Sequence, residues 1–302
     1  MKPRIVIVGS INMDLIGRTP RIPRPGETVL GHEFSTAAGG KGANQAVAAA
    51  RLGAQVTMVG CVGGDAYGQQ LVTRLRQDGV DTQFVTTVAG SHTGVALITV
   101  DDAGENSILV ISGANWQLSK ADVNAAESTI AAADSLVLQL ESPLDVVIYA
   151  AEMAVRHHVP VILNPAPARP LPPSLLALIT YLIPNETEAA LLADCPVNDM
   201  VGVETAVHRL REAGAANVIL TMGSRGAYLH SDRASLAIPA FPVRPVDTTA
   251  AGDAFVAGLA VAVGEKRPLL EAVRFAAVVG ALATTKPGAQ PSLPYRADIP
   301  KQ

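Results

Sequence analysis

The chain has 302 residues, of which 49% are hydrophobic and 17% charged, and its formal net charge is −4. This length and apolar content supply a large buried core, while a weakly negative charge without any basic block argues against a nucleic-acid partner. The two cysteines and six histidines show no CxxC or HExxH spacing, so we expect no zinc site. No apolar stretch reaches the roughly 18 residues of a membrane span, so we expect a cytoplasmic protein.

Short, continuously apolar runs alternate with longer helical patterns along the chain. Runs that are apolar on both faces are typical of strands in a parallel sheet covered by helices. These runs are residues 5–9, 56–62, 135–140, 159–163, 181–183 and 218–222. The helical patterns between them are residues 42–52, 65–78, 119–132 and 142–158. The alternation predicts a doubly wound α/β fold, with a mostly parallel sheet flanked by helices.

Two of the helical patterns have clear start signals. Ser119 and Asp122 have the spacing of a capping box, and Pro143 follows Ser142 where the first helical residue is expected. Both signals predict helices that begin next to these residues.

Two stretches, residues 28–37 and 94–112, break this alternation. They are extended, partly alternating segments, and neither is followed at once by a crossover helix. We interpret them as antiparallel strands of a small β lid, although two edge hairpins on the main sheet would give the same pattern. The expected division is an α/β core of residues 1–11, 37–91 and 114–302 and a lid of residues 12–36 and 92–113.

Residues 246–255, Val-Asp-Thr-Thr-Ala-Ala-Gly-Asp-Ala-Phe, place small side chains directly before a helical pattern that runs to about residue 263. A helix N-terminus with nothing bulky over it presents unpaired amides and the positive end of the helix dipole, which together suit an anion. Asp253 falls on the first turn, where its carboxylate could accept a proton from an attacking hydroxyl. A capping role would explain the same residue equally well from this segment alone.

Residues 38–46, Ala-Gly-Gly-Lys-Gly-Ala-Asn-Gln-Ala, form a second glycine-rich helix entry. Consecutive glycines allow a ligand to approach the backbone closely, and Lys41 and Asn44 lie one helical turn apart on one face. The segment matches neither GxxxxGK[ST] nor GxGxxG. Tight packing of the helix on a strand would explain one glycine, but hardly three beside a lysine and an asparagine.

Polar residues follow several of the predicted strands. Asn12 and Asp14 follow the first strand, Glu141 follows residues 135–140, and Asn185 and Glu188 follow residues 181–183. Open α/β sheets bind ligands beyond the carboxyl ends of their strands. Each residue alone fits an Asx turn or a helix cap, but their agreement predicts a polyhydroxylated substrate.

At these segments the chain resembles the ribokinase branch of the ribokinase-like (PfkB) carbohydrate kinase family. Residues 39–63 match the first family signature and residues 247–260 match the second. Further matching blocks, in the family's order, are residues 9–14, 25–28, 93–97, 113–115, 139–141, 164–168, 185–188, 221–226 and 288–292. The resemblance therefore covers nearly the whole chain.

The resemblance implies an ATP-dependent sugar kinase that phosphorylates the O5 hydroxyl of D-ribose to give ribose 5-phosphate and ADP. Asp253 is similar to the family's catalytic base, and Ala250, Ala251 and Gly252 to its anion hole. The residues implied to bind the sugar are Asn12, Asp14, Gly40, Lys41, Asn44, Ala96, Ile108, Val110, Glu141 and Asp253. Those implied to bind the nucleotide are Asn185, Thr221, Gly223, Ser224, Gly226 and Gly252.

The resemblance also implies Mg²⁺ bound with ATP, organised indirectly by Asn185 and Glu188, and K⁺ as an activating monovalent cation. The loop pair implied to hold K⁺, mainly through carbonyl oxygens, contains Asp247, Thr249, Ala283, Lys286, Gly288 and Ser292. Members of this family often dimerise through their lids, so a homodimer is expected.

Three residues depart from the family pattern. Met13 leaves 2-deoxyribose as a possible substrate. Ala277 occupies the position where some relatives have a histidine against the adenine. Pro287 has no backbone N–H to offer in the potassium loop. The alternatives are a deoxyribokinase or nucleoside kinase of the same family, or a non-catalytic sugar-binding regulator on the same fold. The single Trp and few Phe argue against a nucleoside pocket, and the intact turn before Asp253 argues against a regulator.

Overall fold

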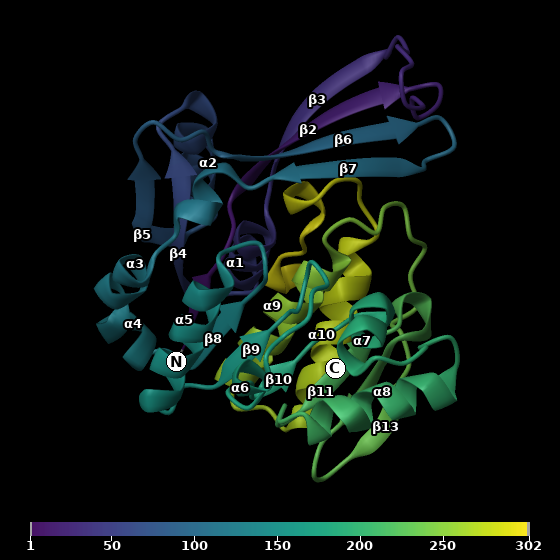
Figure 1. Cartoon of the computed structure of the whole chain (residues 1–302). Coiled ribbons are helices and arrows are strands. Elements are labelled where there is room, and N and C mark those ends of the chain that lie inside the picture. The colour runs from purple at the N-terminus through teal and green to yellow at the C-terminus, as the bar shows by residue number, and fades with distance from the viewer. Residues whose placement is uncertain (1, 301–302) are drawn as a thin grey trace.

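The main sheet of this computed structural model, which describes residues 2–300, has nine strands (Figure 1). They are β1 (Arg4–Val8), β4 (Gln55–Gly63), β5 (Val80–Val88), β8 (Ser135–Leu138), β9 (Val161–Leu163), β10 (Tyr181–Leu182), β11 (Val218–Thr221), β12 (Ala227–His230) and β13 (Ser235–Ile238). Their order is β13-β12-β11-β10-β9-β8-β1-β4-β5. The strands from β11 to β5 are parallel, whereas β12 and β13 are antiparallel to their neighbours.

Helices cover both faces of this sheet. One layer contains α1 (Lys41–Arg51), α2 (Ala66–Gln77), α9 (Ala251–Gly264) and α10 (Leu269–Ala283). The other contains α3 (Lys120–Ala125), α4 (Glu127–Ala131), α5 (Leu144–Arg156), α6 (Pro173–Leu176), α7 (Glu186–Ala193) and α8 (Met200–Glu212). Successive side chains of a strand point to opposite faces, so Ile5 and Ile7 of β1 join the first core while Val6 and Val8 join the second. The predicted doubly wound α/β fold is confirmed.

Within residues 2–300, no helix combines the length and the apolar character that crossing a lipid bilayer requires. Four short 3₁₀ turns complete the described elements: η1 (Gly113–Gln117), η2 (Gly223–Arg225), η3 (Gln290–Ser292) and η4 (Arg296–Asp298).

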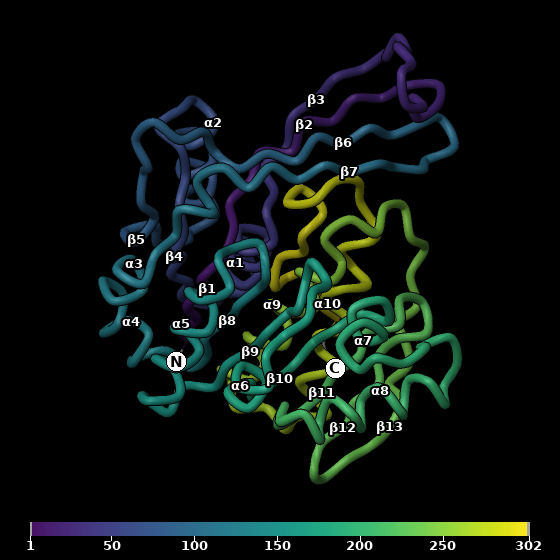
Figure 2. Tube along the Cα trace, viewed as in Figure 1, coloured from purple at the N-terminus to yellow at the C-terminus, as the bar shows by residue number. Residues whose placement is uncertain are grey.

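A separate four-stranded sheet stands off the core beyond the strand ends (Figures 1 and 2). Its strands, in spatial order, are β3 (Glu33–Gly39), β2 (Asn12–Thr19), β6 (Gly94–Asp101) and β7 (Asn106–Ile111). The interpretation as edge hairpins on the main sheet is therefore wrong. The pairs β2–β3 and β6–β7 are antiparallel, as expected. The central pair β2–β6 is parallel, because both strands enter this sheet from the core in the same direction.

Besides β2 of the four-stranded sheet, the sequence did not reveal three strands of the main sheet, β5, β12 and β13. β5 and β13 are the two edge strands of this sheet, and β12 lies between β11 and β13. In β5, buried residues alternate with exposed ones at the start of the strand, and β12 and β13 have four residues each. A search for continuously apolar runs cannot find such strands.

The helix starts follow the sequence closely, with two differences. The capping box of Ser119 and Asp122 is confirmed, but the expected helix over residues 119–132 is interrupted at Ala126, which separates α3 from α4. Pro143 occupies the N-cap of α5, and the first helical residue is Leu144. The missing N–H of Pro143 is harmless there, because the first amides of a helix have no intrahelical partner in any case.

Candidate active site

Polar residues that follow four of the parallel strands gather at one edge of the main sheet. Asn12 follows β1, Glu141 follows β8, Asn164 follows β9 and Asn185 follows β10. Because these strands are parallel, their carboxyl ends meet at the same edge. The start of α1 and the start of α9 reach this edge, because Lys41 and Asp253 line a cavity together with Asn185. The four-stranded sheet stands beyond the edge (Figure 1).

Asp253 lies on the first turn of α9, and its side chain is only 7% exposed. Its Oδ2 accepts a hydrogen bond from Asn44 Nδ2 at 2.9 Å, and its Oδ1 accepts one from Gln45 Nε2 at 2.9 Å. The N-cap residue is Ala250, which makes no side-chain cap bond. The interpretation of Asp253 as a mere helix cap is therefore wrong.

Burial is the main reason why the pKa of Asp253 is raised, and the nearby Glu141 adds to it. The charge of Lys41 and the hydrogen bonds from Asn44 and Gln45 act in the opposite direction. A buried carboxylate with a raised pKa is a stronger proton acceptor than a solvated one.

The first amides of α9 differ in whether they have a hydrogen-bond acceptor. The amide of Ala251 donates to the carbonyl of Thr248 at 3.2 Å, whereas within residues 2–300 the amide of Gly252 has no protein acceptor. A Cβ atom added at Gly252 would meet nothing within 4 Å. Of the three residues predicted to form an anion hole, Gly252 thus presents a free and uncovered donor, while the amide of Ala251 is engaged in the turn.

Glu141 connects the first strand end with the glycine-rich turn. Its Oε2 accepts hydrogen bonds from Ser10 Oγ at 2.5 Å, the Lys41 amide at 3.3 Å and Asn12 Nδ2 at 3.5 Å. Gly40 adopts φ 88°, and a Cβ atom there would lie 2.6 Å from the Asn12 amide. Only glycine tolerates both conditions, so Gly40 allows α1 to begin directly against the site.

Asp14 and Lys41 add opposite charges to the same space. Burial, with contributions from Glu141 and Asp253, raises the pKa of Asp14 to about 7. Burial lowers the pKa of Lys41, but the surrounding carboxylates of Asp253, Glu141 and Glu188 outweigh it, and the net effect is a raised pKa. Lys41 is therefore a firmly charged ammonium among acidic groups.

The lid residues Ala96 and Val110 lie in one row with Asp14 across β2, β6 and β7. Ile108 is two residues before Val110 and so belongs to the same face of the sheet. Ile108 is 54% exposed and Val110 is 43% exposed. The predicted apolar lid contacts thus share a face with Asp14 and present free apolar surface.

Two cavities meet at the start of α9. The smaller, of about 210 Å³, contains Lys41, Asp253 and Glu188 in its lining, and the larger, of about 500 Å³, is lined mainly by small and apolar residues. Thr221 and Gly252 line both. A molecule in the larger cavity can therefore extend past the free amide of Gly252 toward Asp253.

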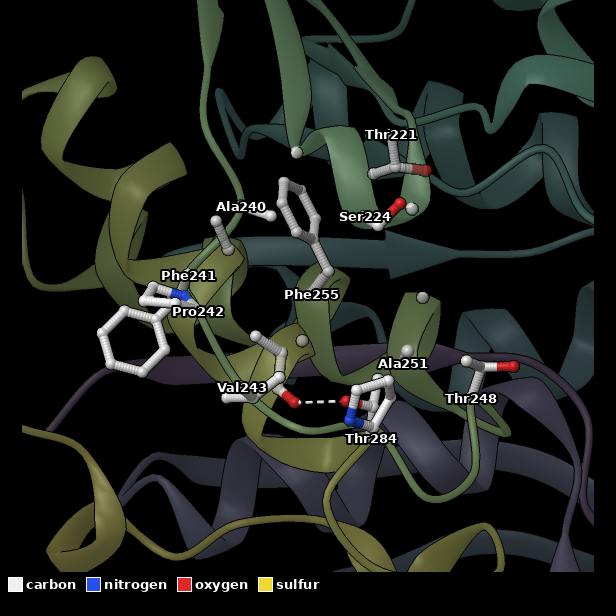
Figure 3. Close-up of a pocket in the computed structure, with 17 residues that line it drawn as sticks. Thr221, Ser224, Ala240, Phe241, Pro242, Val243, Thr248, Ala251, Phe255 and Thr284 are labelled. Atoms are coloured by element: carbon white, nitrogen blue, oxygen red, sulfur yellow. Dashed lines mark hydrogen bonds between the residues drawn. The ribbon is translucent and has the colours of Figure 1, made fainter.

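The larger cavity contains most of the residues predicted to bind a nucleotide. Thr221, Gly223, Ser224, Gly226 and Gly252 all line it. Its other lining residues are Ala240, Phe241, Pro242, Val243, Pro245, Thr248, Ala251, Phe255, Ala277, Gly280, Ala281 and Thr284. Figure 3 shows Thr221 and Ser224 on the side opposite Phe241, Pro242 and Val243, with Phe255 of α9 between them.

Asn185 and Glu188 form a reciprocal pair at the start of α7. Glu188 Oε2 accepts from the Asn185 amide at 2.9 Å, and Asn185 Oδ1 accepts from the Glu188 amide at 2.8 Å. Both line the smaller cavity together with Asp253. Asn185 is not in the lining of the larger cavity, where the other residues predicted to bind the nucleotide lie. Burial raises the pKa of Glu188, against the effects of the Asn185 amide and Lys41.

No group of three or more His, Cys, Asp or Glu side chains in residues 2–300 is arranged to hold a metal ion. Glu188 and Asp253 nevertheless bring two carboxylates to the smaller cavity. Oxygen donors of this kind suit Mg²⁺, which keeps several waters and commonly binds through one or two carboxylates together with substrate phosphates. The residues present thus fit an indirectly held Mg²⁺.

The predicted potassium loops come together at Asp247. Its Oδ1 accepts from Thr249 Oγ1 at 2.6 Å, and its Oδ2 accepts from the Gly288 amide at 2.7 Å. The carbonyl of Thr284, next to Ala283, accepts from the Asp247 amide at 3.1 Å. Lys286 is exposed in the same loop, and the hydroxyl of Ser292 donates to the carbonyl of Ala289 at 2.8 Å. The hydrogen bonds of Asp247 thus bring the two predicted loops together around a carboxylate, a group that suits a cation.

Sequence reasoning missed two groups of residues. The first is the apolar wall at residues 240–245, a loop without any periodic or glycine-rich signal. The second is a buried set of amides behind Asp253, formed by Gln45, Gln139 and Asn164. Asn164 was detectable, because it directly follows β9 as Asn185 follows β10.

Comparison with known proteins gives consistent matches. The sequence profile described as pfkB family carbohydrate kinase matches residues 2–296. A ribokinase of Haemophilus influenzae is 43% identical over 296 residues, which cover 98% of this chain and 97% of that protein. A deoxyribokinase of Salmonella typhimurium is 38% identical over 291 residues, covering 96% of this chain and 95% of that protein. The structure of Arabidopsis thaliana ribokinase complexed with ribose and ATP is similar with a TM-score of 0.91 at 35% identity, covering 99% of this chain and 98% of that one.

Proposed function

The chain belongs to the pfkB family of carbohydrate kinases, and on this basis we infer that it is an ATP-dependent ribokinase that transfers the γ-phosphoryl group of ATP to the O5 hydroxyl of D-ribose. The observation that carries this function is the position of Asp253. Its buried carboxylate lies at the start of α9, where the two cavities meet. A nucleotide in the larger cavity and a sugar under the lid would both reach it.

We place the sugar between the strand ends and the lid. Asn12, Asp14, Lys41, Asn44 and Glu141 bring hydroxyl-binding donors and acceptors to one place. A polyhydroxylated ligand requires such paired groups, because each of its hydroxyls loses water on binding. The backbone of Gly40 and the lid face of Ala96, Ile108 and Val110 would complete the enclosure.

The chemical step assigns one task to each group. Asp253 accepts the proton of O5 as this oxygen forms its bond to the γ-phosphorus, and the bond from that phosphorus to the β–γ bridging oxygen breaks to release ADP. The free amide of Gly252 and the dipole of α9 stabilise the charge on the phosphoryl oxygens in flight. Lys41, held charged by its acidic neighbours, adds positive potential on the same side.

Two cations belong to the proposal. Mg²⁺ would be organised through Asn185 and Glu188, and bound with ATP it supplies neutralisation of phosphate charge. K⁺ would be held by the loops around Asp247, Thr249 and Gly288, with Ala283, Lys286 and Ser292 contributing from the second loop. The charged carboxylate of Asp247 supports this location: burial acts to raise its pKa, but hydrogen bonds from Thr249 and Gly288 hold it below the ordinary range.

The position of Met13 bears on whether 2-deoxyribose is the substrate. Met13 is 1% exposed and packs in the core with Ile11 and Ala38. It occupies the strand position between Asn12 and Asp14, so its side chain points to the opposite face of β2. Its identity therefore gives no reason to expect a sugar that lacks the 2-hydroxyl.

We propose that residues 12–36 and 92–113 act as a lid and that two copies of the chain associate through it. The face opposite Asp14 carries Phe34, Leu97, Leu109 and Ile111, which are 69%, 40%, 59% and 37% exposed. A contiguous apolar face of this kind marks an interaction site. Leu109→Lys should shift the protein from dimer to monomer in sedimentation experiments, whereas a wild-type protein that sediments as a monomer would contradict the proposal.

One assay tests the whole function. ADP formation is measured with ATP and a panel of ribose, 2-deoxyribose, other pentoses and nucleosides, each with and without K⁺. We expect the highest kcat/KM with ribose and a clear stimulation by K⁺. Equal rates with a nucleoside, or no turnover with any sugar, would contradict the proposed function.

A further inference from the structure

A chain of three buried amides begins at Asp253, and one of its members, Asn164, also lines the smaller cavity. Gln45, Gln139 and Asn164 are 0%, 1% and 8% exposed. They come from α1, from the end of β8 and from the end of β9, so segments far apart in the sequence meet here. Most buried amide groups have hydrogen-bond partners, and the partners in this case determine which way the amide of Gln45 points.

The orientation of Gln45 is fixed from two sides. Gln139 Nε2 donates to Gln45 Oε1 at 2.6 Å, which directs the NH₂ group of Gln45 away from Gln139. That NH₂ group donates to Asp253 Oδ1 at 2.9 Å and to Asn164 Oδ1 at 3.3 Å. Asn164 is itself oriented by donating to the carbonyl of Ile183 at 3.2 Å. Both hydrogens of the Gln45 amide are therefore committed.

The arrangement has a structural cost. Gln139 Oε1 is buried and, within residues 2–300, has no hydrogen-bond partner. A Cβ atom at Gly9 would lie 1.9 Å from this oxygen, so the glycine directly after β1 leaves room for the Gln139 side chain. An unpartnered buried oxygen is destabilising, and a side chain kept in that state needs a reason beyond stability.

The geometry points to Gln45, oriented by Gln139, as a positioning residue for the catalytic base. This inference rests on the proposed role of Asp253. The Gln45 amide donates to Oδ1 of Asp253 and so fixes this oxygen against α1. The other oxygen, Oδ2, accepts from Asn44, which is one of the residues proposed to bind the sugar. Oδ2 is then the oxygen that accepts the proton, and neither Gln45 nor Gln139 touches the substrate.

The first test is Gln45→Met, which keeps the length of the side chain and removes the donor. We expect kcat to fall by about tenfold to a hundredfold, the range that loss of a hydrogen bond to a charged group corresponds to. The KM values for ribose and ATP should change by less than about twofold, because the side chain acts only through Asp253. Unchanged kcat in a folded Gln45→Met protein would overturn the inference.

The second test is Gln139→Met, which leaves the Gln45 amide present but free to turn. We expect a smaller fall in kcat, again with unchanged KM values. Because Gln139 acts only through Gln45, the double variant should have the kcat of Gln45→Met alone. Should Gln45→Met fail to fold, Gln139→Met carries the test, and wild-type kcat in that variant would overturn the inference.

Two controls separate this inference from its premise. Thr82 lies on β5 and is 5% exposed, and its hydroxyl accepts a hydrogen bond from Arg76 Nε at 2.8 Å. The substitution Thr82→Val removes this hydroxyl and should lower stability without changing kcat. Asp253→Asn is assayed alone and combined with Gln45→Met. Full activity of Asp253→Asn refutes the catalytic base itself. A large loss in Asp253→Asn, combined with normal kcat in Gln45→Met, refutes only the positioning role.

Discussion

The two cavities at the start of α9 are built in opposite ways. The smaller holds Lys41, Asp253 and Glu188, and hydrogen bonds from neighbouring side chains fix the carboxylate of Asp253. The larger is lined mainly by Ala, Gly, Pro, Val and Phe side chains. Chemistry needs groups fixed to within a fraction of an ångström, whereas a nucleotide that is only held can be recognised by the shape of its pocket. Substitutions in the two cavities should therefore have different kinetic signatures.

The largest effect is expected in the smaller cavity, from Asp253→Asn. Loss of the base should lower kcat at least about a hundredfold. The free energy of unfolding should not fall, because the raised pKa of Asp253 means that its buried charge is unfavourable at neutral pH. ADP release and denaturant unfolding measure the two quantities. Turnover close to that of the wild type would remove the contrast between the cavities.

A smaller effect of a different kind is expected in the larger cavity, from Ala277→Leu. The added carbons would occupy space in the lining of the larger cavity, and we expect the KM for ATP to rise about tenfold, the scale of a steric change in an apolar pocket. The KM for ribose and the kcat should stay near their wild-type values. A parallel rise in the KM for ribose would show that the two cavities do not act separately.

The smallest effect is expected from pH, through Asp14 on the sugar side. Its pKa of about 7 makes it mostly protonated at pH 6 and mostly ionised at pH 8, and only the ionised form accepts hydrogen bonds from sugar hydroxyls with both oxygens. Ribose should therefore bind more weakly at pH 6, by less than about tenfold. Titration calorimetry measures this, with Asp14→Asn as the control in which the dependence disappears. A dependence that persists in Asp14→Asn would show that Asp14 is not the group responsible, and Asp253, whose pKa is also raised, would be tested next.

The pH dependence of stability gives Asp14 an independent check. Its folded pKa lies above the ordinary 3.8, so ionisation of Asp14 lowers the free energy of unfolding as pH rises from about 4 to 7. Asp14→Asn should remove that part of the decline. Identical pH profiles of stability for the variant and the wild type would show that Asp14 titrates normally.

The sequence alone determined the features that depend on neighbouring residues. Runs apolar on both faces identified most of the parallel strands, the capping box of Ser119 was correct, and polar residues after β1, β8 and β10 indicated the edge where the site lies. The small residues before Asp253 indicated an open helix start. These signals are local, because burial, turns and caps leave a mark within a few residues.

The tertiary structure decided what depends on packing between distant segments. The contact of Gln45 with Gln139 spans 94 positions and that with Asp253 spans 208, and the apolar wall at residues 240–245 becomes a cavity only where α9 and α10 close it. The parallel pairing of β2 with β6, the edge strands β5 and β13 and the neighbouring strand β12 also became visible only there. A single sequence records which side chains are buried, but which buried groups meet is determined only when the strands and helices pack together.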